Sequence, residues 1–215
     1  ERVIVDIGWR GTIQDNIARI TGHKIHGCYL GLEKFLNRQQ AGSSKSGYVM
    51  DANAGSGFAI PEYAGLEFLF NAPGGSVKGY EDGKALRDLV AGEEQLVCGV
   101  LRGMQEDLLA YVPRVAEYAR NHGLVSADLQ RLSREILASY CRNPPPEIVS
   151  AFYDLEHNES FGVGQSDVMA FDEGTLRDMT SLHGAELHGA LSRNFSKVRW
   201  NAAFALSKGF SEFLD

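Results

Sequence analysis

The amino-acid sequence predicts an α+β protein, with an α/β piece followed by helices. Three observations support this. The first twenty residues run from a β-branched stretch through two glycines into a helical pattern. Residues 24–90 mix short apolar runs with glycine-rich turn signals. From Gly92 onward, apolar residues recur at the three- and four-residue spacing of a helix face. We therefore expect an α/β piece over residues 1–90 and a mainly helical domain over residues 91–215.

The opening stretch has the order strand, turn and helix. Val3 to Val5 is a β-branched run that ends at Asp6, and Gly8 and Gly11 permit a tight turn after it. Thr12 is expected to cap the helix that follows. The apolar positions of that helix, Ile13, Ile17 and Ile20, recur at three- and four-residue spacing. This order begins a Rossmann-like unit, so we predict that the α/β piece is an incomplete Rossmann-like fold.

The rest of the α/β piece alternates short predicted elements with loops. Glycine and serine clusters between Gln39 and Gly57 indicate loop structure, and Pro61 suits the first turn of a helix. An Asp-Gly pair at residues 82–83 is typical of a hairpin turn. The predicted elements are a strand over 24–30, a short strand over 48–50, a helix over 61–70, and a hairpin of strands 76–80 and 84–89.

The second piece is predicted to be a series of helices. Pro113 is expected to kink or split the first of them, and Ser126 is expected to cap the second. The prolines at 144–146 end the second helix and begin the third. The predicted helices cover residues 93–121, 127–141, 147–155, 173–183 and 190–213.

Composition and charge exclude several classes of function. The chain has 215 residues and a net charge of −7, and its basic residues are scattered, which argues against a nucleic-acid-binding face. It has no apolar run of about eighteen residues, so no transmembrane segment is expected. The three cysteines are odd in number, far apart and without Cys-x-x-Cys spacing. We therefore expect neither a zinc site nor a disulfide, and a cytoplasmic location.

The turn after the first strand is the stretch with the clearest chemistry. A helix N-terminus offers unpaired N–H groups and a partial positive charge to an anion such as phosphate. Gly8, Gly11 and Thr12 would hold that phosphate, and Arg10 would offset its charge. Asp6 would bind Mg²⁺ or act as a base at the carboxyl end of its strand. The loop matches neither the dinucleotide fingerprint nor a P-loop, and many loops of this form bind nothing.

Three further positions complete the candidate site. Trp9 lies between the two glycines and would either cover a ligand or pack over the turn. Glu67 would supply a second acid, or would be the solvated edge of its helix. Residues Gly74, Gly75 and Ser76 would present backbone N–H groups to an anion, or would only be the turn that leads into the hairpin.

Three segments of the chain carry a family resemblance. Asp6-Ile-Gly8-Trp9-Arg10-Gly11-Thr12-Ile-Gln14, followed by residues 27–32, is the first, and residues 66–80 are the second. A weaker third segment joins Asn143-Pro144 to residues 154–162. Together they resemble an uncharacterised bacterial family of predicted hydrolases in the haloacid dehalogenase (HAD) superfamily, whose members are encoded with or fused to glycosyltransferases of surface-polysaccharide synthesis.

The resemblance implies a substrate class and a partner. It covers the region downstream of the hydrolase core, so it implies that this chain is the C-terminal region of a longer protein. A phosphorylated sugar or nucleotide sugar would bind at residues 6–14, Gln14 included. The implied partner is an upstream HAD-like or glycosyltransferase domain. The start at Glu1 without a methionine fits that expectation.

The chain departs from the superfamily pattern at its nucleophile. HAD phosphatases need an aspartate in a D-x-D-x-T/V setting, and this motif is absent here, since Ile7, Gly8 and Trp9 follow Asp6. A carboxylate nucleophile needs a partner acid, and Mg²⁺ offsets the charge of the phosphate. If the resemblance holds, the nucleophile is expected to lie outside this chain.

Two alternative functions remain open at this stage. The first is a non-catalytic interaction module that docks on an upstream catalytic domain, favoured by the missing second acid and by an aromatic C-terminal helix. The second is an ATP-binding fragment of the sugar kinase, actin or Hsp70 type, because residues 6–12 are similar to the phosphate loop of those proteins. Those folds continue from the loop into further strands, whereas residues 12–20 here indicate a helix.

Overall fold

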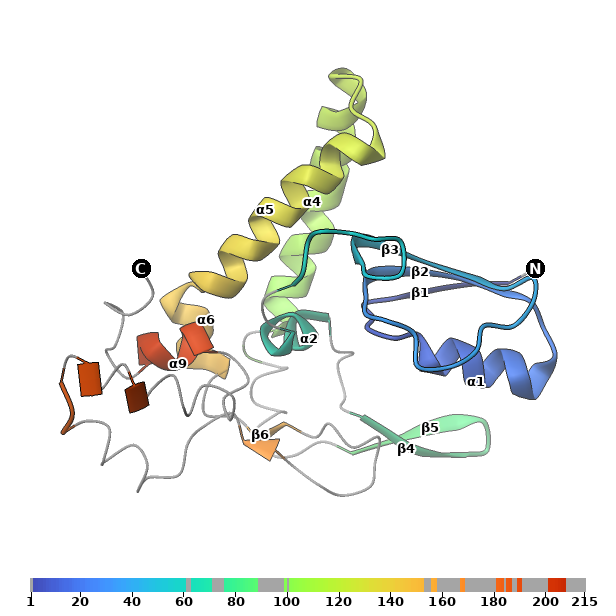
Figure 1. Ribbon diagram of the computed structural model, residues 1–215, viewed down its shortest axis with the longest axis horizontal. Coiled ribbons are helices and arrows are strands. Elements are labelled where there is room, and N and C mark those ends of the chain that lie inside the picture. The colour runs from blue at the N-terminus through green and yellow to red at the C-terminus, as the bar shows by residue number, and fades with distance from the viewer. Residues whose placement is uncertain are drawn as a thin grey trace. The chain divides into compact units, whose positions relative to one another are not determined.

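The computed structural model describes residues 2–60, 63–70, 76–88, 99, 101–152, 156–157, 167–168, 181–183, 185–186, 189–190 and 201–207 (Figure 1). It confirms a mixed α+β protein. The chain forms two compact units, one of residues 1–61 with 119–138 and the other of residues 62–118 with 139–215. The predicted division into residues 1–90 and 91–215 stays a prediction.

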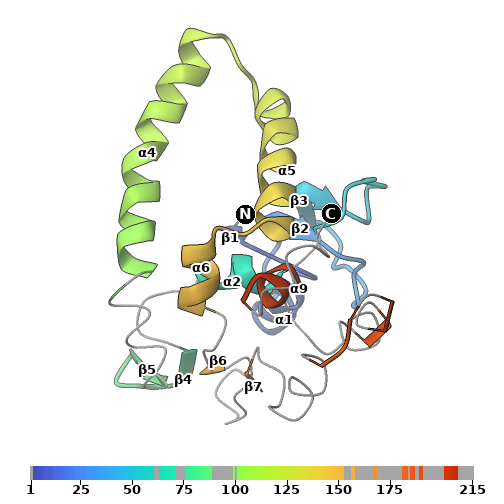
Figure 2. The same cartoon turned by 90° about the vertical axis from the view of Figure 1, so that its left-hand side faces the viewer.

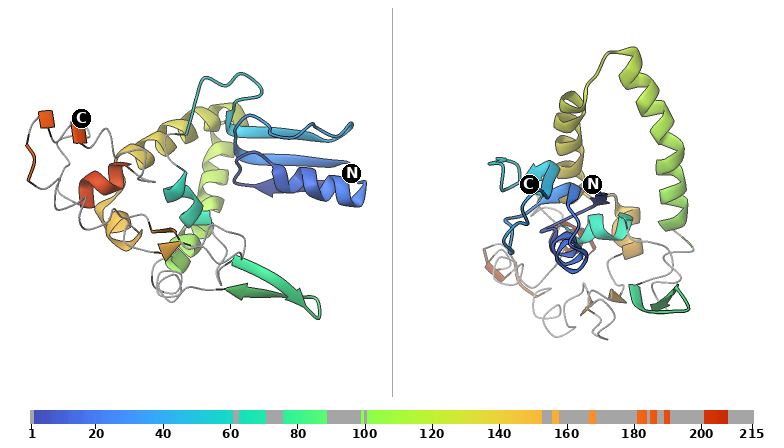
Figure 3. Two further views of the ribbon diagram at one scale, coloured as in Figure 1. Left: turned by 60° about the horizontal axis from the view of Figure 1, so that its bottom comes forward. Right: turned by 90° about the vertical axis from the view of Figure 1, so that its right-hand side faces the viewer.

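The first unit is built on a parallel sheet of β1 (Arg2–Asp6), β2 (Ile25–Leu32) and β3 (Ser44–Asp51), in the order β1-β2-β3. Helix α1 (Thr12–Thr21) joins β1 to β2 and lies on one face of the sheet (Figure 3, left). Asp6 pairs in register with Tyr29, which pairs with Gly47. Because the strands are parallel, their carboxyl ends meet at one edge, where Asp6 lies.

The capping of α1 differs from the prediction. Thr12 is the first helical residue, and the N-cap is Gly11 in a left-handed conformation with φ of 63° and no side-chain cap hydrogen bond. A glycine adopts this backbone without a steric penalty, so the chain turns into the helix through Gly11 and needs no hydroxyl cap. At the other end, the N–H of Gly22 donates to the carbonyl oxygen of Ala18 at 2.9 Å.

The buried face of α1 is not its isoleucine face. Gln14 and Ala18, one turn apart, are each 1% exposed and face the sheet. The isoleucines are exposed instead, with 48% for Ile13, 39% for Ile17 and 83% for Ile20. The reason is that Gln14 bonds to the sheet and so fixes the rotation of the helix about its axis.

Strand β3 is longer than predicted. The polar run from Ser44 to Gly47, expected to be a loop, pairs with β2 from His26 to Tyr29. The polar side chains of this run find partners within the unit, so a strand forms where the composition favours a loop. The apolar core lies toward the other end of the strands, at Leu32, Val49, Met50 and Ile60.

The second unit holds the predicted hairpin and most of the helices. Strands β4 (Ser76–Glu81) and β5 (Lys84–Asp88) are antiparallel and joined by Asp82 and Gly83. Both turn residues have positive φ, 48° and 75°, as a type I′ turn requires. This part of the sequence prediction is confirmed.

The remaining elements are short apart from two helices. Helix α4 (Arg102–Asn121) continues through Pro113 without a break, and α5 (Ser126–Arg142) starts at Ser126 itself, with Val125 N–H bonded to the carboxylate of Asp128. Helices α6 and α9 are in contact (Figure 2). The other elements are α2 (Ala64–Phe70), α6 (Pro146–Phe152), β6 (Glu156–His157), β7 (Asp167–Val168) and α9 (Asn201–Ser207).

Two predicted segments lie largely outside the described residues. They are the helix over 173–183 and most of the helix over 190–213. Within the described parts of the chain, no helix has both the length and the apolar character needed to cross a membrane.

Candidate functional site

The loop after β1 is fastened to the end of β2. Gly31 N–H donates to the carbonyl oxygen of Ile7 at 3.1 Å, and Glu33 N–H donates to that of Trp9 at 2.6 Å. Within the loop, Gly8 N–H approaches Asp6 Oδ1 at 3.4 Å. The loop therefore has a defined backbone path, and the carboxylate of Asp6 lies at its start.

Both loop glycines have structural reasons to be glycine. Gly8 has φ of 144°, and a Cβ there would lie 2.5 Å from the carbonyl oxygen of Gly31. Gly11 has φ of 63°, and a Cβ there would lie 2.9 Å from the hydroxyl oxygen of Tyr29 and from the Lys45 side chain. The close approach of the loop to β2 and β3 requires both glycines whether or not a ligand binds.

Trp9 and Arg10 also contact the protein. A Cβ on Gly31 would lie 3.0 Å from Cζ3 of Trp9, so the indole ring packs against the backbone of β2. The two roles predicted for Trp9, covering a ligand and packing over the turn, stay predictions. The guanidinium of Arg10 donates to the carbonyl oxygen of Lys34 at 3.0 Å. Arg10 thus joins the loop after β1 to the loop after β2.

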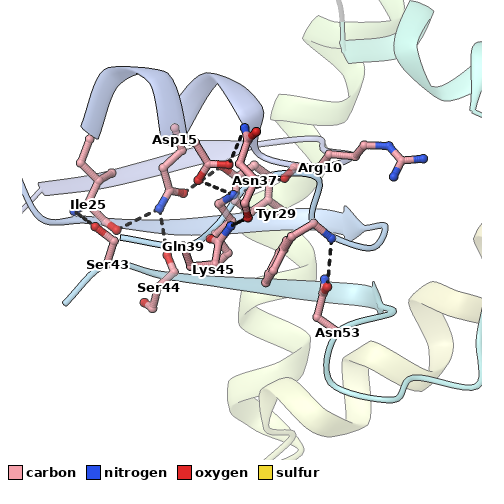
Figure 4. Close-up of polar contacts among 12 residues, drawn as sticks. Arg10, Asp15, Ile25, Tyr29, Asn37, Gln39, Ser43, Ser44, Lys45 and Asn53 are labelled. Atoms are coloured by element: carbon pink, nitrogen blue, oxygen red, sulfur yellow. Dashed lines mark hydrogen bonds and ion pairs between the residues drawn. The ribbon is translucent and has the colours of Figure 1, made fainter. Parts of the chain in front are cut away.

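Gln14 is buried, and both the nitrogen and the oxygen of its side-chain amide form hydrogen bonds. Its Nε2 donates to the carbonyl oxygens of Ile25 at 2.9 Å and Ser44 at 3.0 Å, and its Oε1 accepts a hydrogen bond from the hydroxyl of Tyr29 at 2.9 Å. Figure 4 labels these three partners, Ile25, Ser44 and Tyr29. One side chain therefore holds α1 to both β2 and β3. In this structure the Gln14 amide is directed into the protein, and its predicted role in substrate binding has no support from this geometry.

A buried ion pair lies beside Gln14. Lys45 Nζ is 2.6 Å from Asp15 Oδ1, with side chains that are 0% and 8% exposed. Lys45 Nζ also donates to the carbonyl oxygen of Arg10 at 3.3 Å and lies 4.8 Å from the centroid of the Phe35 ring. Asn37 Nδ2 donates to the second oxygen of Asp15 at 3.2 Å. The ammonium therefore ties the start of α1 to β3.

Tyr29 links this network to Asp6. Burial, together with the smaller effect of the nearby charges of Asp6 and Asp15, raises the pKa of Tyr29 to about 12. The phenol therefore keeps its proton at neutral pH and can donate to Gln14. Asp6 accordingly faces the polar layer between the sheet and α1.

A second carboxylate stands at the same edge of the sheet, at the end of β3. Asp51 accepts hydrogen bonds from the backbone N–H groups of Gly47 at 3.0 Å, Asn53 at 3.0 Å and Ala54 at 3.2 Å. Asn53 in turn donates from Nδ2 to the carbonyl oxygen of Glu33 at 2.9 Å. Asp51 therefore orders the loop after β3, and the sequence signal for this role is the Asp-x-Asn spacing.

The other predicted site residues lie in the second compact unit or outside the described residues. Glu67 lies on α2, in the other compact unit, and Ser76 is the first residue of β4. Gly74 and Gly75 lie outside the described residues. The predicted roles of these four residues stay predictions.

Two hollows are lined by described residues of the first unit, and their linings do not include Asp6, Gly8 or Thr12. One, of about 390 Å³, lies on the sheet face opposite α1 and involves Cys28, Ser46 and Tyr48 with the start of α5. The other, of about 270 Å³, is lined by Asp15, Arg19, Arg38 and Gln40. Among the described residues no group of three or more His, Cys, Asp or Glu side chains is arranged to hold a metal ion.

Sequence reasoning missed Lys45, Tyr29 and Asn37. Lys45 lies in a Gly-Ser-Ser-Lys-Ser-Gly run that has the composition of a loop, so nothing in it indicated a buried cation. Comparison with known proteins adds no further residues: no protein-family model matches the chain, and no curated protein matches its sequence.

Proposed function

We propose that this chain binds a phosphate or sugar-phosphate group at residues 6–14, as the C-terminal region of a HAD-like, glycosyltransferase-associated protein of surface-polysaccharide biosynthesis in the bacterial cytoplasm. In this proposal the β1-α1-β2 crossover is an incomplete Rossmann-like piece, and the hydrolytic nucleophile belongs to an upstream domain. The family and the substrate class derive from the resemblance alone, and the cytoplasmic location is the expectation from the cysteine pattern.

The observation behind phosphate binding is the start of α1. The helix begins directly after the carboxyl end of β1 in a parallel crossover, and its N-cap, Gly11, has no side chain to satisfy the first N–H groups. Those N–H groups and the helix dipole favour an anion at this point. Open parallel sheets bind ligands outside the carboxyl ends of their strands.

The neighbouring side chains have complementary roles in this proposal. The backbone N–H groups of Thr12 and Ile13, with the Thr12 hydroxyl, would donate to phosphate oxygens. Arg10 would offset their charge from the same loop. Asp6 would hold Mg²⁺ together with phosphate oxygens, since carboxylate and phosphate oxygens are the ligands that Mg²⁺ prefers.

Calorimetric titration with inorganic phosphate, glucose 1-phosphate and UDP-glucose, each with and without Mg²⁺, tests the proposal. Thr12→Pro removes one N–H at the first helical position, where proline is tolerated, and Thr12→Ala removes only the hydroxyl. We expect Thr12→Pro to weaken phosphate binding roughly tenfold, the effect of one hydrogen bond to a charged group, and more than Thr12→Ala does.

Two controls isolate the site. Ser126→Pro makes the same change at the first position of α5 and should leave binding unaltered. Asp6→Asn should remove the Mg²⁺ dependence, whereas Asp82→Asn in the exposed hairpin turn should not. Absence of binding by all three ligands to the folded protein, or equal binding by Thr12→Pro and the wild type, would contradict the proposal.

A non-catalytic interaction module remains the second candidate. The observation that favours it is the exposure of apolar side chains on the first unit, with 67% for Val3 and 82% for Val5 on β1. An ATP-binding fragment of the sugar kinase type is less well supported, because the loop leads into α1 and not into a strand.

A further inference from the structure

Strand β1 lies at an edge of the parallel sheet. Within the described residues, its one neighbouring strand is β2. Val3 and Val5 point to the sheet face opposite α1 and are 67% and 82% exposed. An edge strand with exposed apolar side chains is a template on which another strand can pair.

The opposite edge of the sheet does not offer the same template. The guanidinium of Arg134 on α5 donates to the carbonyl oxygen of Val49 at 2.7 Å, and Gln130 on the same helix donates to that of Tyr48. Side chains of α5 therefore bond to backbone carbonyl groups of β3. Pairing with a further strand is favoured at β1.

The isoleucines of α1 lie on the β1 side of the helix. At about 100° per residue, Asp15 lies on one side of the buried Gln14, and Ile13, Ile17 and Ile20 lie on the other. The Asp15 side faces β3, because Asp15 bonds to Lys45. The isoleucine flank therefore faces the β1 edge, where it is 39–83% exposed.

The backbone groups of β1 that do not face β2 can be identified from the pairing of these two strands. The carbonyl oxygen of Ile7 accepts from Gly31 N–H, so it points toward β2. Backbone groups alternate along a strand, so those of Arg2, Ile4 and Asp6 point away from β2. These three residues are the ones available to a new strand.

The sequence of β1 is complementary to itself in the antiparallel direction. When two copies pair about Ile4, the outward backbone groups of Ile4 face their own equivalents, and Arg2 lies opposite Asp6 at both ends. Opposite charges directly across a strand pair are favourable, and like charges are unfavourable. On the sheet face opposite α1, Val3 of one copy lies across from Val5 of the other.

We propose that the occupant of this edge is a second copy of the chain, related by a two-fold axis through Ile4. The two three-stranded sheets join into one, and both α1 helices lie on the same face of the joined sheet, with their isoleucine flanks turned toward each other. The interface is isologous, as closed dimers require.

Sedimentation velocity from low to high micromolar concentration tests the dimer. The wild type should be dimeric, and Ile20→Glu should raise its dissociation constant roughly tenfold or more, because it replaces an apolar side chain of the isoleucine flank with a charged one. Leu109→Glu is the matched control, since Leu109 is 72% exposed on α4. A monomeric wild type, or a dimer dissociated by Leu109→Glu and not by Ile20→Glu, would overturn the proposal.

The charge pattern gives a test that a misfolded variant cannot imitate. Arg2→Asp and Asp6→Arg each place like charges opposite one another, so each variant alone should be largely monomeric. Mixed together, the two variants place opposite charges across the strands at both ends and should form a heterodimer. Circular dichroism of each variant verifies folding. Folded single variants that remain dimeric, or that do not associate when mixed, would also contradict the register proposed here.

Discussion

The two flanks of α1 have different surroundings. On the flank toward β3, Asp15 forms an ion pair with Lys45 at 2.6 Å and accepts a hydrogen bond from Asn37. On the flank toward β1, Ile13, Ile17 and Ile20 are 39–83% exposed. The polar flank therefore has its partners within the chain, and the apolar flank is exposed.

This difference shows that the spacing of apolar residues identifies the apolar side of a helix but not the side that faces the sheet. The isoleucine spacing marks one side of α1 as apolar, but a buried glutamine decides which side faces the sheet. Gln14 has three hydrogen bonds that would be lost if the helix rotated to bury the isoleucines. The cost of three unsatisfied buried groups, about 1–3 kcal/mol each, is comparable to the gain from burying the isoleucines, so rotation brings no clear benefit.

We expect the largest loss of stability from a substitution on the polar flank, which bonds to β3. Lys45→Met leaves Asp15 buried without its cation, and we expect the free energy of unfolding to fall by about 3–5 kcal/mol. Urea denaturation followed by circular dichroism measures this change. The exposed pair Arg131–Glu135, whose side chains are 80% and 60% exposed, is the control. Arg131→Ala should cost less than about 1 kcal/mol, and an equal loss in both variants would contradict the distinction.

The next effect concerns the residue that sets the helix rotation. Gln14→Leu keeps the side chain near its size but leaves two carbonyl oxygens and the Tyr29 hydroxyl without partners. We expect a loss of about 2–4 kcal/mol in unfolding free energy. Asn16→Leu, two positions along on the exposed side, should change it by less than about 0.5 kcal/mol. If Gln14→Leu were as stable as the wild type, the isoleucine flank would be free to turn inward.

The fold was predictable where local chemistry decides it. The Asp82-Gly83 hairpin, the strand-turn-helix opening and the helices α4 and α5 follow from turn residues and apolar spacing, which act over a few residues. The strand at Ser44–Gly47 was not predictable, because its polar residues are stabilised by partners on β2 and α1. Tertiary contacts there override a loop-like composition.

The sequence predicts where the candidate site lies along the chain, but not the side chains that pack behind it. A carboxylate, two glycines and a helix start can be read from residues 6–12, and the structure places them at the carboxyl edge of a parallel sheet. The layer of Tyr29, Gln14 and Lys45 behind them could not be read, since these residues are brought together from β2, α1 and β3. Their partners are separated by up to thirty-five residues.

A substitution at Gly8 should cause an intermediate loss of stability. It tests whether the loop after β1 needs this glycine for its backbone path, independently of any ligand. Gly8→Ala brings a Cβ to 2.5 Å from the Gly31 carbonyl oxygen at a φ of 144°. We expect a loss of about 2 kcal/mol in unfolding free energy, from strain alone and without any ligand. Gly57→Ala has no atom within 4 Å of the added Cβ and should have little effect. Equal thermal midpoints for both variants would show that the loop does not need Gly8 for its backbone path.

A smaller effect should appear at high pH. Burial raises the pKa of Tyr29 to about 12 in the folded protein, from 10.0 in the unfolded chain. The folded state therefore holds the phenolic proton more tightly. This contribution to stability is complete below pH 10 and is lost as the pH rises toward 12. Tyr29→Phe should cost about 1–2 kcal/mol at pH 7, through the unpaired Gln14 oxygen, and should reduce the loss of stability between pH 10 and 12. An unchanged pH profile in Tyr29→Phe would assign that loss to other groups.

We expect the smallest change in unfolding free energy from a substitution on the apolar flank. Measuring it at low and high protein concentration distinguishes the stability of one chain from the stability of a dimer. Ile20 is 83% exposed, so Ile20→Gln removes little buried area from a single chain. Measured at a protein concentration low enough for monomers, its unfolding free energy should differ from the wild type by less than about 0.5 kcal/mol. Unfolding of a dimer depends on protein concentration. At high concentration the wild type should therefore gain thermal stability and Ile20→Gln should gain less. A large loss at low concentration would mean that Ile20 is buried within one chain, and the contrast between the two flanks of α1 would then be wrong.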